Sequence, residues 1–210
     1  MGARKLTKRG IKRRAQIIGT AFTLFAEQGY HGTTVGDICD ALGVGKGVFY
    51  WYFESKEALF KELLQSSLFQ LRRAQHAAIE GIEDPRVRIE CGIRASIDFF
   101  RADPGLLSLI RIAARYEEFA SFVNRGQQII ASDTAVHLKE GMSRGTIRRG
   151  DPQLMAHGIL GALFHFVEVY FGTESESHNG RPQLADEAAA FCMQGILESA
   201  PLPNVPPRLS

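Results

Sequence analysis

The chain has 210 residues, of which 45% are hydrophobic and 23% are charged, with a formal net charge of +2. These values predict a soluble globular protein of one or two domains that buries its own core. We expect no membrane-spanning run and no secretory signal, which places the protein in the cytoplasm. The three cysteines, Cys39, Cys91 and Cys192, are far apart and odd in number, which excludes a disulfide framework and a zinc-ligand spacing.

The charge is distributed unevenly along the chain. Residues 1–60 carry nine Lys or Arg against five Asp or Glu, so the positive excess lies at the N-terminal end. Such an end is where a polyanion would bind, although a solvated basic tail explains the excess equally well. The arm from Arg4 to Arg14 could add phosphate or minor-groove contacts, or it could be dispensable.

Apolar residues recur at three- and four-residue spacing through most of the chain, and strand signals are nearly absent. This periodicity predicts an all-α protein. The expected helices cover, in chain order, residues 8–28, 34–42, 45–52, 56 to about 81, 84–101, a short helix from 104, 119 to about 141, 152–171 and 183–198.

Local signals place several of these helix ends. Gly29 and Gly43 follow apolar runs and can end the first and second helices. Asp84-Pro85 and Asp151-Pro152 each pair a capping residue with proline at the first helical position, so each should begin a helix.

The last two predicted helices, 152–171 and 183–198, are apolar on most of their surface and need partners on two sides. They also carry small residues that permit close approach: Gly158, Gly161, Ala162, Ala185, Ala188, Ala189 and Gly195. We expect two copies of this helix pair to form a four-helix bundle across a dimer axis, with burial inside one subunit as the alternative.

The segment from Thr33 to Leu59 has the layout of a helix-turn-helix. Gly43 permits a left-handed turn, and Val44 can fill the space between the two helices. The second short helix begins with small residues around Lys46, which allows its backbone to approach base edges, and Lys46 can reach guanine or phosphate.

Further along this helix, Val48 could touch a thymine methyl group. Tyr50 and Trp51 could donate to backbone phosphates, whereas the neighbouring aromatic residues are expected in the core.

This segment resembles the signature of the tetracycline-repressor (TetR) family, preceded by the helix that the family requires. The matching residues are Thr34, Ile38, Ala41, Gly43, Val44, Gly47, Tyr50, Phe53, Lys56 and Leu59. The resemblance implies a DNA-binding domain over residues 1–55, a helical ligand-binding and dimerisation domain over 56–200, and an extended tail over 201–210. It also implies a homodimeric repressor that an unknown small molecule releases from operator DNA, with no catalytic residues and no cofactor.

The resemblance assigns phosphate contacts to Thr33 or Thr34 and to Lys56. The complete expected DNA-binding set is Thr33, Thr34, Gly45, Lys46, Gly47, Val48, Tyr50, Trp51 and Lys56. Gly45 departs from the Ser or Thr usual in the family, which removes one phosphate-binding hydroxyl while costing the helix only a few tenths of a kcal/mol.

The expected ligand-binding residues are aromatic or charged: Arg94, Asp98, Phe99, Phe100, Arg111, Tyr116, Phe164 and Phe166. Arg94 and Asp98 lie four residues apart, so an ion pair between them is the alternative to ligand contact.

Two further patterns leave alternatives open. His157, His165 and Glu168 share one helical stripe that could hold a metal but is more simply a polar seam at a dimer interface, so we expect no metal. Cys39 could sense oxidation, but a buried thiol is the commoner state. The alternative functions are a constitutive or architectural DNA-binding protein and a transcriptional activator, while a helical enzyme lacks any recognisable catalytic spacing.

Overall fold

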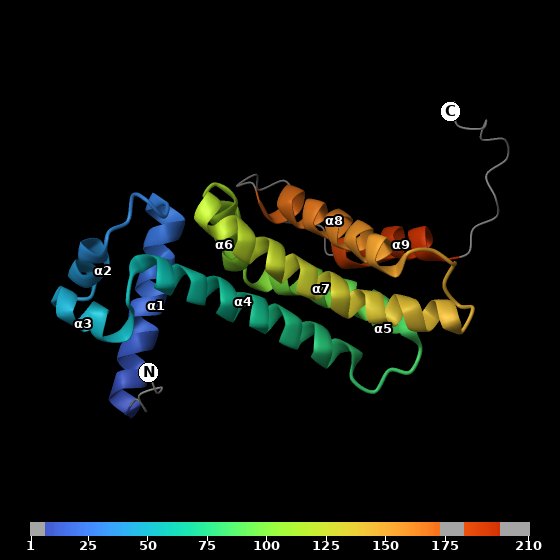
Figure 1. Ribbon diagram of the computed structural model, residues 1–210, viewed down its shortest axis with the longest axis horizontal. Coiled ribbons are helices and arrows are strands. Elements are labelled where there is room, and N and C mark those ends of the chain that lie inside the picture. Colours follow the sequence, from blue (N-terminus) through green and yellow to red (C-terminus); the bar gives the residue numbers. More distant parts are fainter. Residues whose placement is uncertain (1–6, 173–182, 198–210) are drawn as a thin grey trace. The chain divides into compact units, whose positions relative to one another are not determined.

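The computed structural model describes residues 7–172 and 183–197, and within this part the secondary structure is entirely α-helical (Figure 1). The helices of this part are α1 (Lys8–Gln28), α2 (Val35–Ala41), α3 (Lys46–Tyr52), α4 (Lys56–Ile79), α5 (Pro85–Ala102), α6 (Gly105–Ala114), α7 (Glu117–Ser143), α8 (Pro152–Phe171) and α9 (Leu184–Ile196). The predicted all-α fold with an N-terminal helix-turn-helix is confirmed. The predicted tail, 201–210, lies outside the described residues.

Most predicted helix ends agree with the structure to within a few residues. The Thr7 hydroxyl accepts a hydrogen bond from Gly10 N at 3.2 Å and caps α1, and Gly29, at φ +77°, ends it. Helix α7 begins two residues before the expected Phe119. The N–H of Tyr116 bonds Ala113 O at 3.2 Å and closes α6, which leaves only a tight turn before the next helix.

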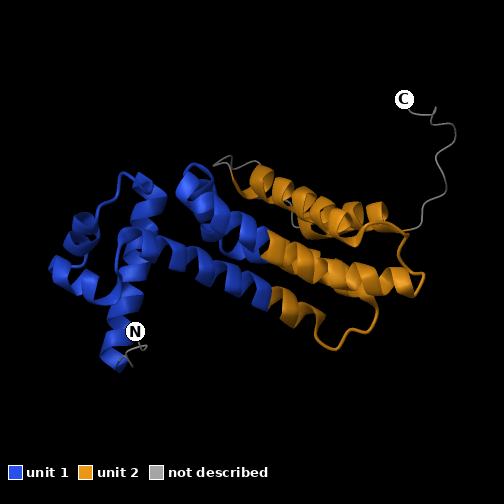
Figure 2. Ribbon diagram, viewed as in Figure 1, with its two compact units in different colours: residues 1–73, 99–127 blue, residues 74–98, 128–210 orange. Residues whose placement is uncertain are grey.

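The chain divides into two compact units (Figure 2). Unit 1 comprises residues 1–73 and 99–127, and unit 2 comprises residues 74–98 and 128–210. Unit 1 therefore contains the helix-turn-helix together with α6 and the beginning of α7. The domain boundary expected near residue 55 stays a prediction.

Aromatic side chains dominate the core of unit 1. Phe25, Phe49, Phe60 and Phe119 are each fully buried. Phe25 and Phe60 meet edge to face with ring centroids 5.4 Å apart, and Phe60 contacts Phe119 at 4.5 Å. The core thus joins α1 and α4 to the start of α7.

Lys56 and Tyr30 connect the loop before α2 to this core. The Lys56 ammonium donates to Tyr30 O at 2.6 Å and to Thr33 O at 2.7 Å, and it lies 4.2 Å from the centroid of the Tyr30 ring. Burial lowers the pKa of Lys56, while nearby Glu118 acts in the opposite direction. The first residue of α4 therefore holds the loop that leads into α2.

Helices α1 and α6 approach each other closely at Gly105. A β-carbon at Gly105 would lie 2.3 Å from Phe22 Cζ, so the contact requires glycine. The Gly105 N–H donates to Asp103 Oδ1 at 2.9 Å, which fixes the start of α6.

Polar contacts tie the helices of unit 2 together. Gln75 donates to the buried Ser96 hydroxyl at 2.9 Å, and Arg88 pairs with Glu140 at 2.9 Å. The Arg148 guanidinium donates to Gly195 O at 2.8 Å and thereby satisfies a carbonyl at the end of α9.

Contrary to the expectation from the sequence, one helix, α8, is long and apolar enough by length and composition to cross a membrane. A core helix of a soluble protein meets the same criteria, and α8 packs against α9 and has buried residues such as Ile159 and Leu163. Only 28% of its apolar window is buried, however, which leaves apolar surface that the described residues do not cover.

Ionisation of Tyr30 should make the stability of the protein depend on pH at the alkaline end. Burial, and then the negative charges of Glu118 and Glu57, raise the pKa of Tyr30 from 10.0 to about 12. The folded state therefore retains the phenol proton over a range in which the unfolded chain releases it. The stabilising effect is complete below pH 10 and is lost as the pH rises through about 12.

We expect the free energy of unfolding of the wild-type protein to fall relative to that of Tyr30→Phe, by up to about 1.4 kcal/mol per pH unit in this range. Urea unfolding of both proteins at several pH values measures the difference. Tyr50→Phe, at a side chain that is 56% exposed, is the matched control. A difference that stays constant with pH would contradict the prediction.

Candidate nucleic-acid interface

The turn between α2 and α3 is built on one glycine. Gly43 has φ +62°, and its N–H bonds Asp40 O at 3.1 Å, while the N–H of Val44 bonds Cys39 O at 3.0 Å. This pair of bonds ends α2 in a left-handed cap, which a residue with a β-carbon would adopt only with strain. Val44 packs against the core of unit 1, so the turn fixes the direction in which α3 leaves.

A reciprocal cap begins α2. The Thr34 backbone N–H donates to Asp37 Oδ2 at 2.7 Å, and the Thr34 hydroxyl donates to the same oxygen at 2.8 Å and accepts from Asp37 N at 3.2 Å. These two donors, with smaller contributions from the Lys46 and Lys56 ammonium groups, hold the pKa of Asp37 below its usual value. Asp37 was not among the expected site residues, although the spacing Thr-x-x-Asp is the signal for this cap.

Helix α3 has one buried aromatic side and one exposed side. Phe49 is fully buried, whereas Tyr50 and Trp51 are 56% and 52% exposed. Gly45, Lys46 and Gly47 are exposed at the start of the helix, and Val48 is half-buried against the core. Gly45 caps α3 without a side-chain hydrogen bond. The structure thus exposes five of the six expected residues of α3 and its cap, while Val48 packs partly against the core.

The two expected threonines have different surroundings. Thr34 is exposed at the start of α2, whereas Thr33 is fully buried. The Thr33 hydroxyl lies 3.1 Å from Leu24 O and 3.0 Å from Gly29 O, so its position is inside the loop and not at the surface. The phosphate contact expected from Thr33 is therefore incompatible with this geometry, and Thr34 is the available member of the pair.

Lys56 is only partly available for a ligand. Two carbonyl oxygens accept from its ammonium group, which has three N–H donors. A phosphate could therefore meet the one remaining donor, and the structural role of Lys56 is the larger one.

The expected ligand-binding residues are divided between the two units. Phe99, Phe100, Arg111 and Tyr116 belong to unit 1, and Arg94, Asp98, Phe164 and Phe166 belong to unit 2. Arg94 pairs with Glu90 at 2.7 Å and with Asp186, and the ion pair with Asp98 stays a prediction. The Phe99 and Phe100 rings meet edge to face, the Tyr116 ring lies against His31, and the Phe166 ring contacts Phe191.

The histidine stripe of α8 and the thiol of α2 offer little for chemistry. His157 and His165 are exposed, and no group of three His, Cys, Asp or Glu in the part of the chain that the structure describes could hold a metal ion. Cys39 is 2% exposed, and burial raises the pKa of its thiol, which disfavours the reactive thiolate.

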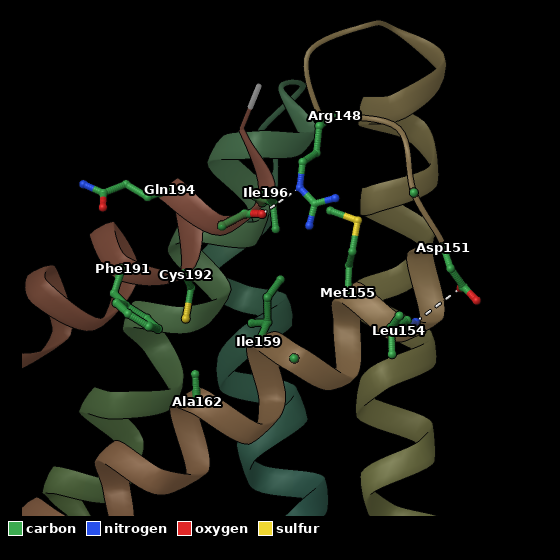
Figure 3. A pocket seen from close by; sticks show the side chains of 13 residues that line it. Arg148, Asp151, Leu154, Met155, Ile159, Ala162, Phe191, Cys192, Gln194 and Ile196 are labelled. Carbon is green, nitrogen blue, oxygen red and sulfur yellow. Dashed lines mark hydrogen bonds between the residues drawn. The ribbon is translucent and has the colours of Figure 1, made fainter. Parts of the chain in front are cut away.

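An apolar groove of about 670 Å³ lies in unit 2, between α8, α9 and the loop before α8 (Figure 3). Met155, Ile159 and Cys192 line it, together with the small residues Gly158 and Ala162. Two large apolar side chains at this groove are exposed to solvent, Leu154 by 71% and Phe191 by 61%. The expected ligand-binding residues do not line this groove.

Comparison with known proteins relates the N-terminal part of the chain to one family. Residues 17–63 match the family model described as bacterial regulatory proteins, tetR family. The chain is 33% identical over 120 residues, 56% of its length, to a probable acrEF/envCD operon repressor of Escherichia coli (strain K12). It is also 33% identical over 92 residues, 44% of its length, to the HTH-type transcriptional activator FasR of Mycolicibacterium smegmatis. These alignments span 54% and 42% of the two relatives, about half of their length.

The fold extends this similarity to nearly the whole chain. The fatty acid degradation regulator FadR from Bacillus halodurans superimposes with a TM-score of 0.78, over 91% of this chain and 98% of that one, at 22% identity. That match shows a common fold, and the family model covers the helix-turn-helix whose geometry is described above. The helix-turn-helix domain therefore belongs to the tetR family of bacterial regulatory proteins, a family of transcriptional regulators and not of enzymes, and the rest of the chain shares the fold of TetR-family structures.

Proposed function

We propose that this protein is a sequence-specific DNA-binding repressor. The observation that carries the proposal is the pair of short helices α2 and α3, joined by the left-handed turn at Gly43, with an exposed surface of small, basic and aromatic residues on α3. A rigid helix with this surface fits the major groove of DNA.

The proposed contacts follow from exposure and donor chemistry. Gly45 and Gly47 allow the α3 backbone to approach the bases, and Val48 can meet a thymine methyl group. The Tyr50 hydroxyl and the Trp51 indole N–H are suited to phosphate oxygens, as is the Thr34 hydroxyl. The remaining donor of Lys56 adds a further phosphate contact.

We propose that the protein acts as a homodimer through α8 and α9. The support is the apolar groove between these helices, with Leu154 and Phe191 exposed beside it and small residues along α8. A two-fold axis would place the same surface of each copy on the other, which buries these side chains and sets two α3 helices about 34 Å apart on a palindromic site.

Release by a small-molecule effector is the proposed regulation, with the effector unidentified. Gly105 at the start of α6 is packed against Phe22 of α1 within unit 1, so a ligand that displaces α6 would strain α1. Only a ligand that binds the displaced conformation more tightly can reduce the population of the DNA-binding conformation. The candidate contacts are those named in the sequence analysis, Arg94, Asp98, Phe99, Phe100, Arg111, Tyr116, Phe164 and Phe166.

The alternatives are a constitutive or architectural DNA-binding protein and an activator, and the relatives include one protein named as an activator. The test adds small molecules from a panel of fatty acids, steroids and aromatic compounds to the complex with DNA. Loss of the complex distinguishes a ligand-released repressor from a constitutive DNA-binding protein. The cytoplasm, where the genome of a bacterium lies, is the proposed location.

Operator binding should depend on Tyr50. The wild-type protein should select duplexes from a random pool, and footprinting of these duplexes should reveal a near-palindrome. The affinity of the protein for this duplex should fall steeply as the salt concentration rises. Tyr50→Ala should weaken binding to this duplex by at least about tenfold, because it removes an exposed hydroxyl and ring from α3. Phe69→Ala, at an aromatic residue of α4 that is similarly exposed, at 65%, is the matched control. An unchanged affinity for Tyr50→Ala would exclude α3 as the recognition helix.

The dimer should depend on Leu154. Leu154→Arg places a charge at the apolar groove and should give a monomer in sedimentation equilibrium, since an unpaired charge in an apolar interface costs several kcal/mol. Val136→Arg alters a side chain of α7 that is similarly exposed, at 63%, and should leave the dimer intact. A dimer that survives Leu154→Arg but not Val136→Arg would place the interface elsewhere.

A further inference from the structure

The side chain of Lys46 lies across the first turn of α2 at Gly36. A β-carbon built on Gly36 would lie 3.5 Å from Lys46 Cε, 3.8 Å from Lys46 Nζ and 3.2 Å from Thr34 Oγ1. These are contact distances, so the Lys46 stem occupies the space that a longer side chain at residue 36 would fill.

The charges around this position are arranged closely. Asp37 is exposed and receives two hydrogen bonds from Thr34, and the Lys46 ammonium is near enough to lower the pKa of that carboxyl further. The Lys56 ammonium contributes in the same direction from α4. Lys46 therefore lies at the exposed start of α2, beside Thr34 and Asp37, although its own backbone belongs to α3.

This placement bears on what Lys46 can touch. A lysine side chain has four methylene groups, and here they run from α3 back to α2. To reach a base edge, Lys46 would have to leave this position and extend beyond α3. A phosphate bound beside Thr34 would instead lie close to the ammonium group in its present position.

We infer that Lys46 binds a DNA phosphate together with Thr34, and that Gly36 is the residue that positions it there. Gly36 has no side chain, which leaves room for the Lys46 stem. The contacts that distinguish one DNA sequence from another are then made by the other residues of α3. The inference rests on the proposed DNA-binding function and goes beyond it, because it separates the phosphate contact from the base contacts.

Asp37 supplies a physical reason for this arrangement. Its carboxylate caps α2 and is exposed at the same end of the helix, where it would repel an approaching phosphate. The ammonium of Lys46 offsets that charge. The start of α2 can therefore approach the DNA backbone while it retains its cap.

The first part of the test measures how Lys46→Ala changes DNA binding. The probes are the selected duplex, its single-base-pair variants and a random-sequence duplex. A lost phosphate contact should weaken binding to all of them by a similar factor, on the order of tenfold. It should also reduce the slope of log affinity against log salt by about 0.9 for each subunit bound. A loss confined to one base-pair position, with an unchanged salt slope, would overturn the inference.

The second part tests the role of Gly36. Gly36→Ala adds only the β-carbon, which fits beside Lys46, whereas Gly36→Val adds two further methyl groups in the space of the Lys46 stem. In both variants the β-carbon at residue 36 lies close to Thr34 Oγ1. A difference in DNA binding between the two variants therefore reports on the Lys46 side chain. We expect Gly36→Val to reproduce the reduced salt slope of Lys46→Ala, and Gly36→Ala to resemble the wild type in that slope, with a cooperative thermal unfolding transition in both that shows they are folded.

A double variant separates positioning from a direct clash with DNA. In the Lys46→Ala background, Gly36→Val should weaken binding by less than twofold, because the group that it displaces is already absent. A full additional loss there would overturn the positioning role of Gly36. The wild type tests the proposed function separately: equal binding to selected and random duplexes would reject sequence specificity but leave the salt slopes measurable. A protein that binds neither duplex would reject both proposals.

Discussion

The ammonium group of Lys56 is the contact on which the DNA-binding half of unit 1 depends. It joins two carbonyl oxygens of the loop between α1 and α2, and it lies over the Tyr30 ring at the edge of the aromatic core. A lysine in such surroundings loses hydration, and these acceptors and the ring compensate for that loss. The buried Thr33 hydroxyl holds the same loop from within. The start of α2, and with it the position of α3, is thereby fixed relative to α4.

The same core links the helix-turn-helix to helices that occur much later in the chain. Tyr30 contacts Tyr116 and Phe119, and Phe22 is packed against Gly105 with no space for another atom. A change at α6 or at the start of α7 therefore acts directly on α1 and on the loop before α2. In closely packed contacts of this kind, the movement of one side chain displaces its neighbours, because there is no free space for it to move into. This is the physical basis on which effector release is proposed.

The two surfaces proposed for partners have opposite chemistry. The surface of α2 and α3 combines small residues, hydrogen-bond donors and the ammonium group of Lys46, which suits a polyanion whose backbone must be approached closely. The groove of α8 and α9 is apolar, with large exposed side chains beside small ones, which suits a second copy of the same surface. The low burial of α8 supports this proposal, because the described residues leave most of its apolar window uncovered.

The sequence by itself determined the helices and the turn. Apolar periodicity, the glycines at 29 and 43 and the Asp-Pro pairs before α5 and α8 are local signals, and local backbone chemistry decides where helices begin and end. The spacing of the helix-turn-helix is equally local, so its residues could be named in advance.

Only the tertiary structure decided what those residues contact. Thr33 and Thr34 are neighbours with similar side chains, yet one is buried and the other exposed, because the packing of the loop against Leu24 selects between them. Lys56 and Lys46 are both basic residues of the motif, but one is bound to carbonyl groups and the other lies across Gly36. Side-chain contacts between segments distant in sequence depend on packing, which periodicity and spacing do not encode.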